Sequence, residues 1–133
     1  MQYARLLVAA VIIDESGRVL LCKRSMNKKI APGAWHMPGG GIDEGESMEG
    51  AAVRELREEL GFIVSSVVVT DVTYVFDADD GQHHLTFVRV IVSGDVVLND
   101  ENESFEWVLP ENFQNYLEPH VLDVNLRAAN FKI

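Results

Sequence analysis

The residues best suited to chemistry in this sequence are the carboxylates that follow three consecutive glycines at 39–41. Seven of them fall within residues 43–59: Asp43, Glu44, Glu46, Glu49, Glu55, Glu58 and Glu59. Like charges one helical turn apart repel each other and lower stability. We therefore expect a positively charged group to bind at this segment.

Three of these carboxylates, Glu55, Glu58 and Glu59, are spaced three and four positions apart on a predicted helix over 48–60. They share one face of the helix, with Cβ atoms roughly 5–6 Å apart, and we expect them to be partly shielded. Oxygen ligands this close suit Mg²⁺ or Mn²⁺. A solvated face with ion pairs is the alternative. The position near the C-terminal end, where the helix dipole disfavours negative charge, favours the cation site.

Length and composition predict a single domain over residues 1–133 that buries its own core, with 47% hydrophobic and 24% charged residues. The net charge of −10 argues against a nucleic-acid-binding surface, because affinity for phosphate backbones comes mostly from Lys and Arg. No apolar run reaches membrane-spanning length, and the N-terminus lacks the layout of a secretory signal. The single cysteine, Cys22, lies in an apolar run and is expected to be buried. These features predict a cytoplasmic protein.

The elements that must position the carboxylates can be read from periodicity and turn residues. Strands are expected over 3–13, 18–24, 62–70, 72–77, 83–93 and 105–109. The helix over 48–60 has Ser47 as a plausible N-cap and Gly61 just past its end. Further helices are expected after Pro110 and over about 119–130, with loops over 25–37 and 98–104. This pattern predicts an α/β or α+β domain with a mixed sheet.

The glycine and helix segment resembles the Nudix box, G-x5-E-x7-R-E-U-x-E-E-x-G-U, where U is a bulky apolar residue. Its fixed positions are met by Gly40, Glu46, Arg54, Glu55, Leu56, Glu58, Glu59, Gly61 and Phe62. Every fixed position is met, and only Phe62 stretches the last class from aliphatic to aromatic. The resemblance implies the Nudix fold, an α/β/α sandwich with a mixed, curved β-sheet.

The resemblance also implies a chemistry, the hydrolysis of a nucleoside diphosphate linked to another group with the help of divalent cations. Matching positions imply metal binding and catalysis by Glu55, Glu58 and Glu59, one of which, or a downstream Glu, is the base. They imply that Arg54 orients Glu55, and that a backbone carbonyl near Gly39 or Gly40 completes the metal shell. A cation on the phosphates would neutralise their charge and activate a water molecule.

The Nudix family commonly uses one more acidic residue, on a loop before a Trp. In this sequence the loop spans 99–107 and offers Glu101 and Glu103. We favour Glu101 as a catalytic and metal-binding residue, because it lies six positions before Trp107, which is similar to the family's spacing. An exposed acidic loop is the alternative.

Candidate substrate-binding residues lie on the predicted strands and loops around the box. They are Arg5, Lys23 and Arg24 for phosphate oxygens, Trp35 for stacking on a base, and Gly39 and Gly40 for close backbone approach. Surface charge is the alternative for the three basic residues. Phe76 and Phe87 could also stack on a base, but core packing is the more common role for each of these three aromatic residues, Trp35 included.

The overall arrangement looks closest to the Nudix nucleoside triphosphatases. This resemblance implies a pyrophosphohydrolase that uses Mg²⁺, or Mn²⁺, and releases pyrophosphate from a small-molecule nucleotide substrate, with neither a nucleic acid nor a membrane as partner. One alternative is a hydrolase of a nucleotide sugar or dinucleotide. The other is a nucleotide-sensing module without turnover. The preferred base and the formation of a homodimer stay open.

Overall fold

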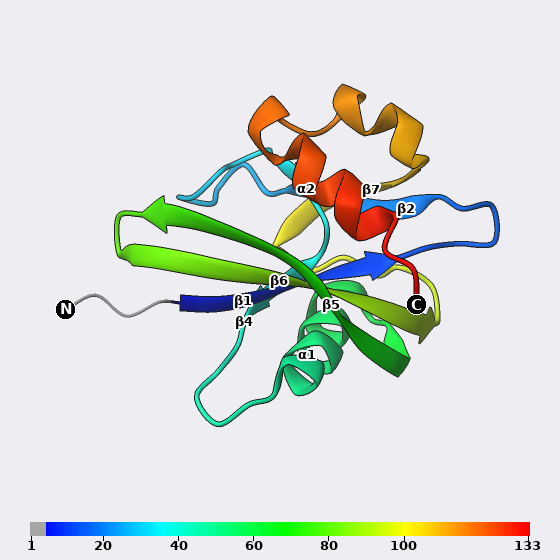
Figure 1. Cartoon of the computed structure of the whole chain (residues 1–133), viewed down its shortest axis with the longest axis horizontal. Helices are drawn as coiled ribbons and strands as arrows, with labels where there is room; N and C mark the ends of the chain where they lie inside the picture. Colours follow the sequence, from blue (N-terminus) through cyan, green and yellow to red (C-terminus); the bar gives the residue numbers. More distant parts are fainter. Residues whose placement is uncertain (1–4) are drawn as a thin grey trace.

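The structure, a computed structural model, describes residues 5–133. Within them it contains these elements in chain order (Figure 1): β1 (Arg5–Ile12), β2 (Val19–Arg24), β3 (Trp35–His36), β4 (Gly39–Gly41), α1 (Met48–Leu60), β5 (Ile63–Ala78), β6 (Gly81–Ser93), β7 (Asn102–Val108), the 3-10 helix η1 (Pro110–Asn115) and α2 (Pro119–Ala129). In this part of the chain, no helix is both long and apolar enough to cross a bilayer.

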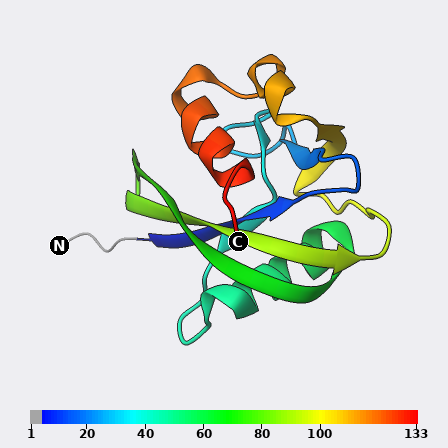
Figure 2. The same ribbon diagram turned by 45° about the vertical axis from the view of Figure 1, so that its right-hand side comes forward.

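The strands form two sheets, with orders β4-β1-β6-β5 and β3-β2-β7. Strand β1 is parallel to β6 and antiparallel to β4, so the larger sheet is mixed as predicted. The long strands β5 and β6 bend across the molecule, with α1 and α2 on opposite sides of them (Figures 1 and 2). The predicted α/β/α sandwich with a mixed, curved sheet is therefore confirmed.

Strand β1 explains why the sandwich has two cores. Val8, Ala10 and Ile12 pack in the core that contains α1. The alternate residues Ala9 and Val11 pack in the core that contains α2. Because both faces of the strand are covered, its sequence is a continuous apolar run without polar alternation. Cys22 is fully buried in the α1 core, as expected, and burial raises the pKa of its thiol to about 12.

Helix α1 begins and ends where the sequence predicts. The Ser47 hydroxyl accepts a hydrogen bond from the Gly50 N–H at 3.0 Å, which caps the first turn. Gly61 ends the helix in the left-handed conformation, at φ 71°. Leu56 and Leu60 are fully buried, so the apolar stripe fixes how the helix is rotated and which side its carboxylates face.

Several strand predictions are wrong in detail. The runs 62–70 and 72–77 form one strand, β5. Its pairing with β6 continues past the predicted gap at residue 71 through a register shift between Val69 and Thr73. The Thr70 hydroxyl stabilises this irregularity by donating to the Phe87 carbonyl at 2.7 Å and accepting from the Val72 N–H at 3.0 Å. The expected loop over 25–37 contains β3, the glycine run forms β4, and β7 begins at Asn102 and not at 105.

Candidate active site

Strand β4 brings the glycines against both β1 and the carboxylates of α1. Gly39 and Gly40 pair with Ala9 and Val8 of β1. A Cβ atom on Gly39 would lie 1.9 Å from the Val8 carbonyl oxygen, and one on Gly40 would lie 2.6 Å from the Glu55 Cδ atom. Glycine is therefore required at Gly39, where the clash is with backbone, whereas at Gly40 it lets the Glu55 carboxyl rest directly on the backbone.

Arg54 connects the carboxylates around this strand. Its Nη1 donates to Glu55 Oε1 at 2.8 Å and lies 3.5 Å from Glu58 Oε2. Its Nε and Nη2 donate to the two carboxylate oxygens of Glu46 at 2.8 and 2.9 Å, and Nη2 also donates to the Gly41 carbonyl. These bonds lower the pKa of Glu46 to about 2. The contact with Glu55 is the geometry expected of a residue that orients this carboxylate.

Glu59 is the buried member of the acidic face, with 4% of its surface exposed. Burial, followed by the neighbouring Glu55 carboxyl, raises its pKa to about 9. Its Oε1 lies 3.3 Å from Asn102 Nδ2. Its Oε2 is the one buried side-chain nitrogen or oxygen within residues 5–133 that has no hydrogen-bond partner. An orphaned buried oxygen costs about 1–3 kcal/mol, and a set of carboxylate oxygens suits a hard divalent cation.

The three glutamates differ in burial more than their common helix face suggests. The side chain of Glu55 is 15% exposed and that of Glu58 is 56% exposed, whereas Glu59 is buried. The expectation of partial shielding is therefore wrong for Glu58. Within residues 5–133, no three Asp, Glu, His or Cys side chains are gathered tightly enough to hold a metal ion as they stand. Arg54 contacts two of the carboxylates and already supplies positive charge there.

The loop before β7 places Glu101 close enough for its charge to contribute to the raised pKa of Glu59. Glu101 accepts a hydrogen bond from Lys28 Nζ at 3.0 Å and lies 3.7 Å from Arg24 Nη1. Glu103 instead lies 3.7 Å from Lys23 Nζ and accepts from the Met26 N–H. This geometry favours Glu101 over Glu103 as the distal carboxylate.

Two residues of this region were missed by sequence reasoning. Lys28 lies in the predicted loop and meets Glu101 across 73 positions of the chain. Asn102 is 2% exposed and contacts both His36 and Glu59. Its position directly after Glu101 could have pointed to Asn102 as a site residue. The strand was predicted to begin at 105, so Asn102 was assigned to the loop and not to a strand. The two ring nitrogens of His36 lie within hydrogen-bond distance of the Met37 carbonyl oxygen and of Asn102 Oδ1.

A cavity of about 590 Å³ opens beside the glycine strand, between the larger sheet and α2. Four of the predicted substrate-binding residues line it: Arg24, Trp35, Gly39 and Gly40. Phe76 and the buried Phe87 also line it. The structure does not bring Arg5 and Lys23 into this cavity. Arg5 lies 3.9 Å from Asp80, and Lys23 pairs with Glu103 as described above.

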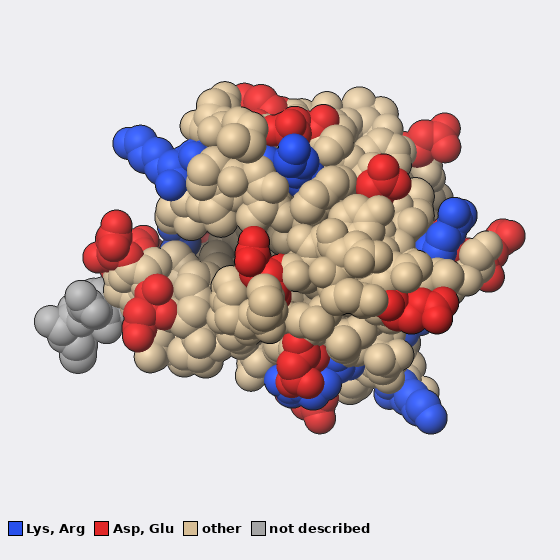
Figure 3. Space-filling model, turned by 90° about the horizontal axis from the view of Figure 1, so that it is seen from above, with Lys and Arg blue, Asp and Glu red and all other residues tan. Residues whose placement is uncertain are grey.

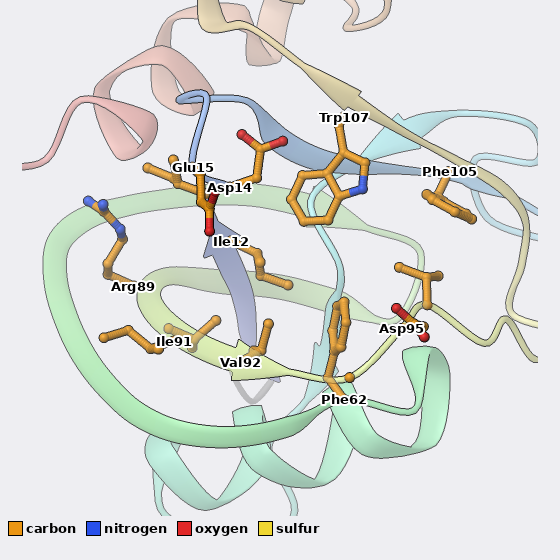
Figure 4. A pocket seen from close by; sticks show the side chains of 14 residues that line it. Ile12, Asp14, Glu15, Phe62, Arg89, Ile91, Val92, Asp95, Phe105 and Trp107 are labelled. Carbon is orange, nitrogen blue, oxygen red and sulfur yellow. The ribbon is translucent and has the colours of Figure 1, made fainter.

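A second cavity, of about 600 Å³, lies at the ends of β1 and β6 (Figure 4). Phe62, Phe105 and Trp107 project into it, with Asp14 and Asp95 at its edge (Figure 4). None of the predicted site residues lines it. The catalytic predictions therefore concern the first cavity and the acidic face of α1.

The surface seen from the α2 side carries acidic side chains at many separate points (Figure 3). The Lys and Arg side chains of residues 5–133 that are visible in this view stand apart from one another (Figure 3). A duplex or single strand needs a continuous run of basic residues along its backbone. Among the described residues, no such run is visible on this face (Figure 3).

The fold and the site together define a particular class of protein, a mixed-sheet sandwich in which a glycine strand and a glutamate-rich helix meet beside a cavity. The sequence model of the NUDIX domain matches residues 4–126. The chain therefore belongs to the NUDIX family and is a Nudix hydrolase. Hydrolases of this family generally use divalent metal ions and act on small-molecule nucleotide substrates.

Known relatives agree with this assignment. The chain is 35% identical over 123 residues to nucleoside triphosphatase NudI of Salmonella arizonae, an alignment that covers 82% of this chain and 85% of the relative. The crystal structure of the MutT protein from Methanosarcina mazei superposes with a TM-score of 0.82 at 25% identity, covering 98% of both chains. The solution structure of the E. coli ORF135 protein superposes with a TM-score of 0.79 at 29% identity, covering 96% of this chain and 89% of the other.

Proposed function

We propose that this Nudix hydrolase is a Mg²⁺-dependent pyrophosphohydrolase of nucleoside triphosphates, which converts them to monophosphate and pyrophosphate. The observation that carries the proposal is the acidic face of α1, where a buried, partnerless Glu59 oxygen lies beside Glu55 and an arginine that orients it. The name of the NudI relative favours nucleoside triphosphates as the substrate class.

The residues of the proposed metal centre are Glu55, Glu58, Glu59, Glu101 and the backbone carbonyl of Gly40. A bound Mg²⁺ ion would neutralise phosphate charge and lower the pKa of a coordinated water molecule. Mn²⁺ offers similar chemistry. Arg54 holds Glu55 against Gly40, so this carboxylate is ordered before any ligand arrives.

The cavity beside β4 would bind the nucleotide. Trp35 packs edge-on against Tyr116, with ring centroids 5.1 Å apart, which fixes its orientation at the cavity wall. Arg24 is anchored by a bond from its Nε to the Ile30 carbonyl and lies between the cavity and Glu101. A triphosphate that reached from this cavity to the acidic face would pass Gly39 and Gly40, which line the cavity. Arg5 and Lys23 lie outside the cavity, so they would contribute only to the electrostatic potential around it.

The proposal is tested by measuring pyrophosphate and phosphate release separately across a panel of NTPs, dNTPs, nucleotide sugars and dinucleotides with Mg²⁺. We expect pyrophosphate from at least one triphosphate and no turnover with EDTA. Turnover of only a sugar nucleotide or dinucleotide would move the substrate class to the first alternative. Nucleotide binding without turnover of any panel member would favour the second alternative, a nucleotide-sensing module.

The site assignment is tested by Glu58→Gln, which removes one charge from an exposed side chain of α1. We expect it to abolish turnover while the fold survives. Glu49→Gln is the matched control, because Glu49 is also exposed on α1 but lies in its first turn. Wild-type rates in Glu58→Gln would contradict the assignment.

The remaining expectations belong to the same proposal. Residues 1–133 would form one domain, and the protein would be cytoplasmic. Whether two copies associate as a homodimer stays open, and sedimentation equilibrium measures it directly. Either outcome leaves the catalytic proposal untouched, because every residue of the proposed metal centre comes from one chain.

A further inference from the structure

A line of three polar side chains runs from the smaller sheet to the acidic face of α1. His36 of β3 lies with its Nδ1 2.8 Å from the Met37 carbonyl oxygen and its Nε2 2.9 Å from Asn102 Oδ1. Asn102 Nδ2 lies 3.3 Å from Glu59 Oε1. The line thus ends on the carboxyl group whose other oxygen has no partner.

The pairing of the smaller sheet explains how Asn102 comes to point inward. Strand β2 pairs with β3 through Cys22 and His36, and with β7 through Lys23 and Ser104. The register then shifts, so that Arg24 faces Asn102 and Glu103 is left unpaired. Such a bulge re-aims the side chains beside it. Asn102 therefore faces the core, where it is fully buried.

Stability alone does not explain a buried amide in this place. Burying a polar group costs free energy that its hydrogen bonds only roughly offset. Apolar side chains of similar volume commonly stabilise a core as well as a buried polar cluster or better. The amide instead fixes the orientation of the Glu59 carboxyl, because it bonds Oε1 and leaves Oε2 free.

The amide can hold Glu59 Oε1 in either protonation state. With Nδ2 toward Glu59 it donates to a carboxylate, and its Oδ1 then accepts from His36 Nε2–H. Rotated by 180°, it accepts from a protonated Glu59 and donates to a neutral His36. In both cases the Met37 carbonyl, which only accepts, keeps a hydrogen on His36 Nδ1. The contact to Oε1 thus survives the loss of the Glu59 proton.

We propose that Asn102 and His36 are positioning residues for Glu59, which hold its Oε1 so that Oε2 remains the oxygen available to a divalent cation. The proposal rests on the metal centre of the proposed function. Partners that orient a metal ligand from behind are generally needed for its affinity, and their loss costs about 10- to 100-fold. His36 acts through Asn102, so its own effect should be the smaller of the two.

The test is the affinity of the nucleotide-free protein for Mn²⁺, measured from the electron paramagnetic resonance signal of the free ion well below the unfolding temperature. We expect Asn102→Leu to weaken Mn²⁺ binding about 10- to 100-fold. His36→Phe should weaken it less, and His36→Gln, which can still bond the amide, should restore part of the loss. If Asn102→Leu does not fold, the two His36 variants decide the question.

Thr70→Val is the matched control for general destabilisation. Thr70 is buried and hydrogen-bonded like Asn102, but its hydroxyl bonds the backbone of Phe87 and Val72 at the irregularity of β5. We expect it to lower the melting temperature and leave Mn²⁺ affinity unchanged. Wild-type affinity in both Asn102→Leu and His36→Phe, or an equal loss in Thr70→Val, would overturn the inference.

Glu59→Gln separates this inference from the proposed function. If the wild type binds no Mn²⁺, or if Glu59→Gln binds it as well as the wild type, the proposed metal centre itself is wrong. If Glu59→Gln loses affinity while the Asn102 and His36 variants keep it, the metal centre stands and only the positioning role fails.

Discussion

Replacing Glu59 by Gln should make the metal-free protein more stable at alkaline pH. Glu59 is buried, and its pKa is raised from 4.5 to about 9 by burial and by the neighbouring Glu55. As the pH rises, the wild type must therefore either keep a proton on the Glu55–Glu59 pair or bury an additional negative charge. Glutamine resembles the protonated form, keeps an oxygen and an NH₂ group at the same place, and never ionises.

The size of the effect follows from proton linkage. Between pH 4.5 and about 9, the folded chain keeps a proton that the unfolded chain has released. The free energy of unfolding of the wild type therefore falls as the pH rises. The slope is about 1.4 kcal/mol per pH unit, or about 3 kcal/mol from pH 6 to pH 8. The contribution is fully present below pH 4.5 and is lost above about 9.

Other shifted groups do not disturb this comparison. The pKa of Glu46 is lowered to about 2, so its contribution is constant above pH 6. Burial lowers the pKa of His36, which makes stability rise with pH near the ordinary histidine range, but this group is present in both proteins. The difference between wild type and Glu59→Gln therefore isolates the Glu59 proton.

Urea unfolding at pH 6, 7 and 8 with EDTA measures the difference. We expect the stability advantage of Glu59→Gln over the wild type to grow by about 3 kcal/mol across this window. Adding Mg²⁺ should then stabilise the wild type at pH 8, because the ion binds only the folded state, and should have a much smaller effect on the variant. Parallel pH dependences of the two proteins in EDTA would refute the reasoning.

Three further predictions concern residues around Glu59. Gly40→Ala should lower kcat severely, because the new Cβ would lie 2.6 Å from the Glu55 carboxyl carbon, while circular dichroism should show that the fold survives. Arg54→Lys keeps the charge but cannot donate to all of the arginine's acceptors at once, so steady-state kinetics should show a loss of kcat at unchanged net charge. Glu101→Gln should lower kcat by about 100-fold or more, whereas Glu103→Gln should not; equal rates in these two variants would remove Glu101 from the site.

The parts of this structure that the sequence predicts well are those with local signals. Helix α1 is bounded by a capping serine and a left-handed glycine, and both act within one turn of the residues they stop. The spacing of Glu55, Glu58 and Glu59 fixes their common helix face in the same local way. The mixed sheet followed from the alternation of strand-like and helical runs together with the family resemblance.

The parts that escaped prediction depend on contacts between distant residues. Strand β3 has two residues and β4 has three glycines, and neither carries a strand signal of its own. They become strands because β2 and β1 lie beside them. Likewise, the start of β7 at Asn102 is set by a register shift against β2, which no periodicity within 98–109 could reveal.

The burial of the three glutamates shows where local spacing stops being informative. Helical geometry gives all three the same face, but the sheet and the loop before β7 cover that face unevenly. Glu59 lies against Asn102 and has a raised pKa, Glu55 lies on Gly40 and is bound by Arg54, and Glu58 reaches solvent. Their chemical differences are therefore set by tertiary contacts from residues 40 and 102. A search for further members of such a site should begin with the residues that pack behind its most buried carboxylate.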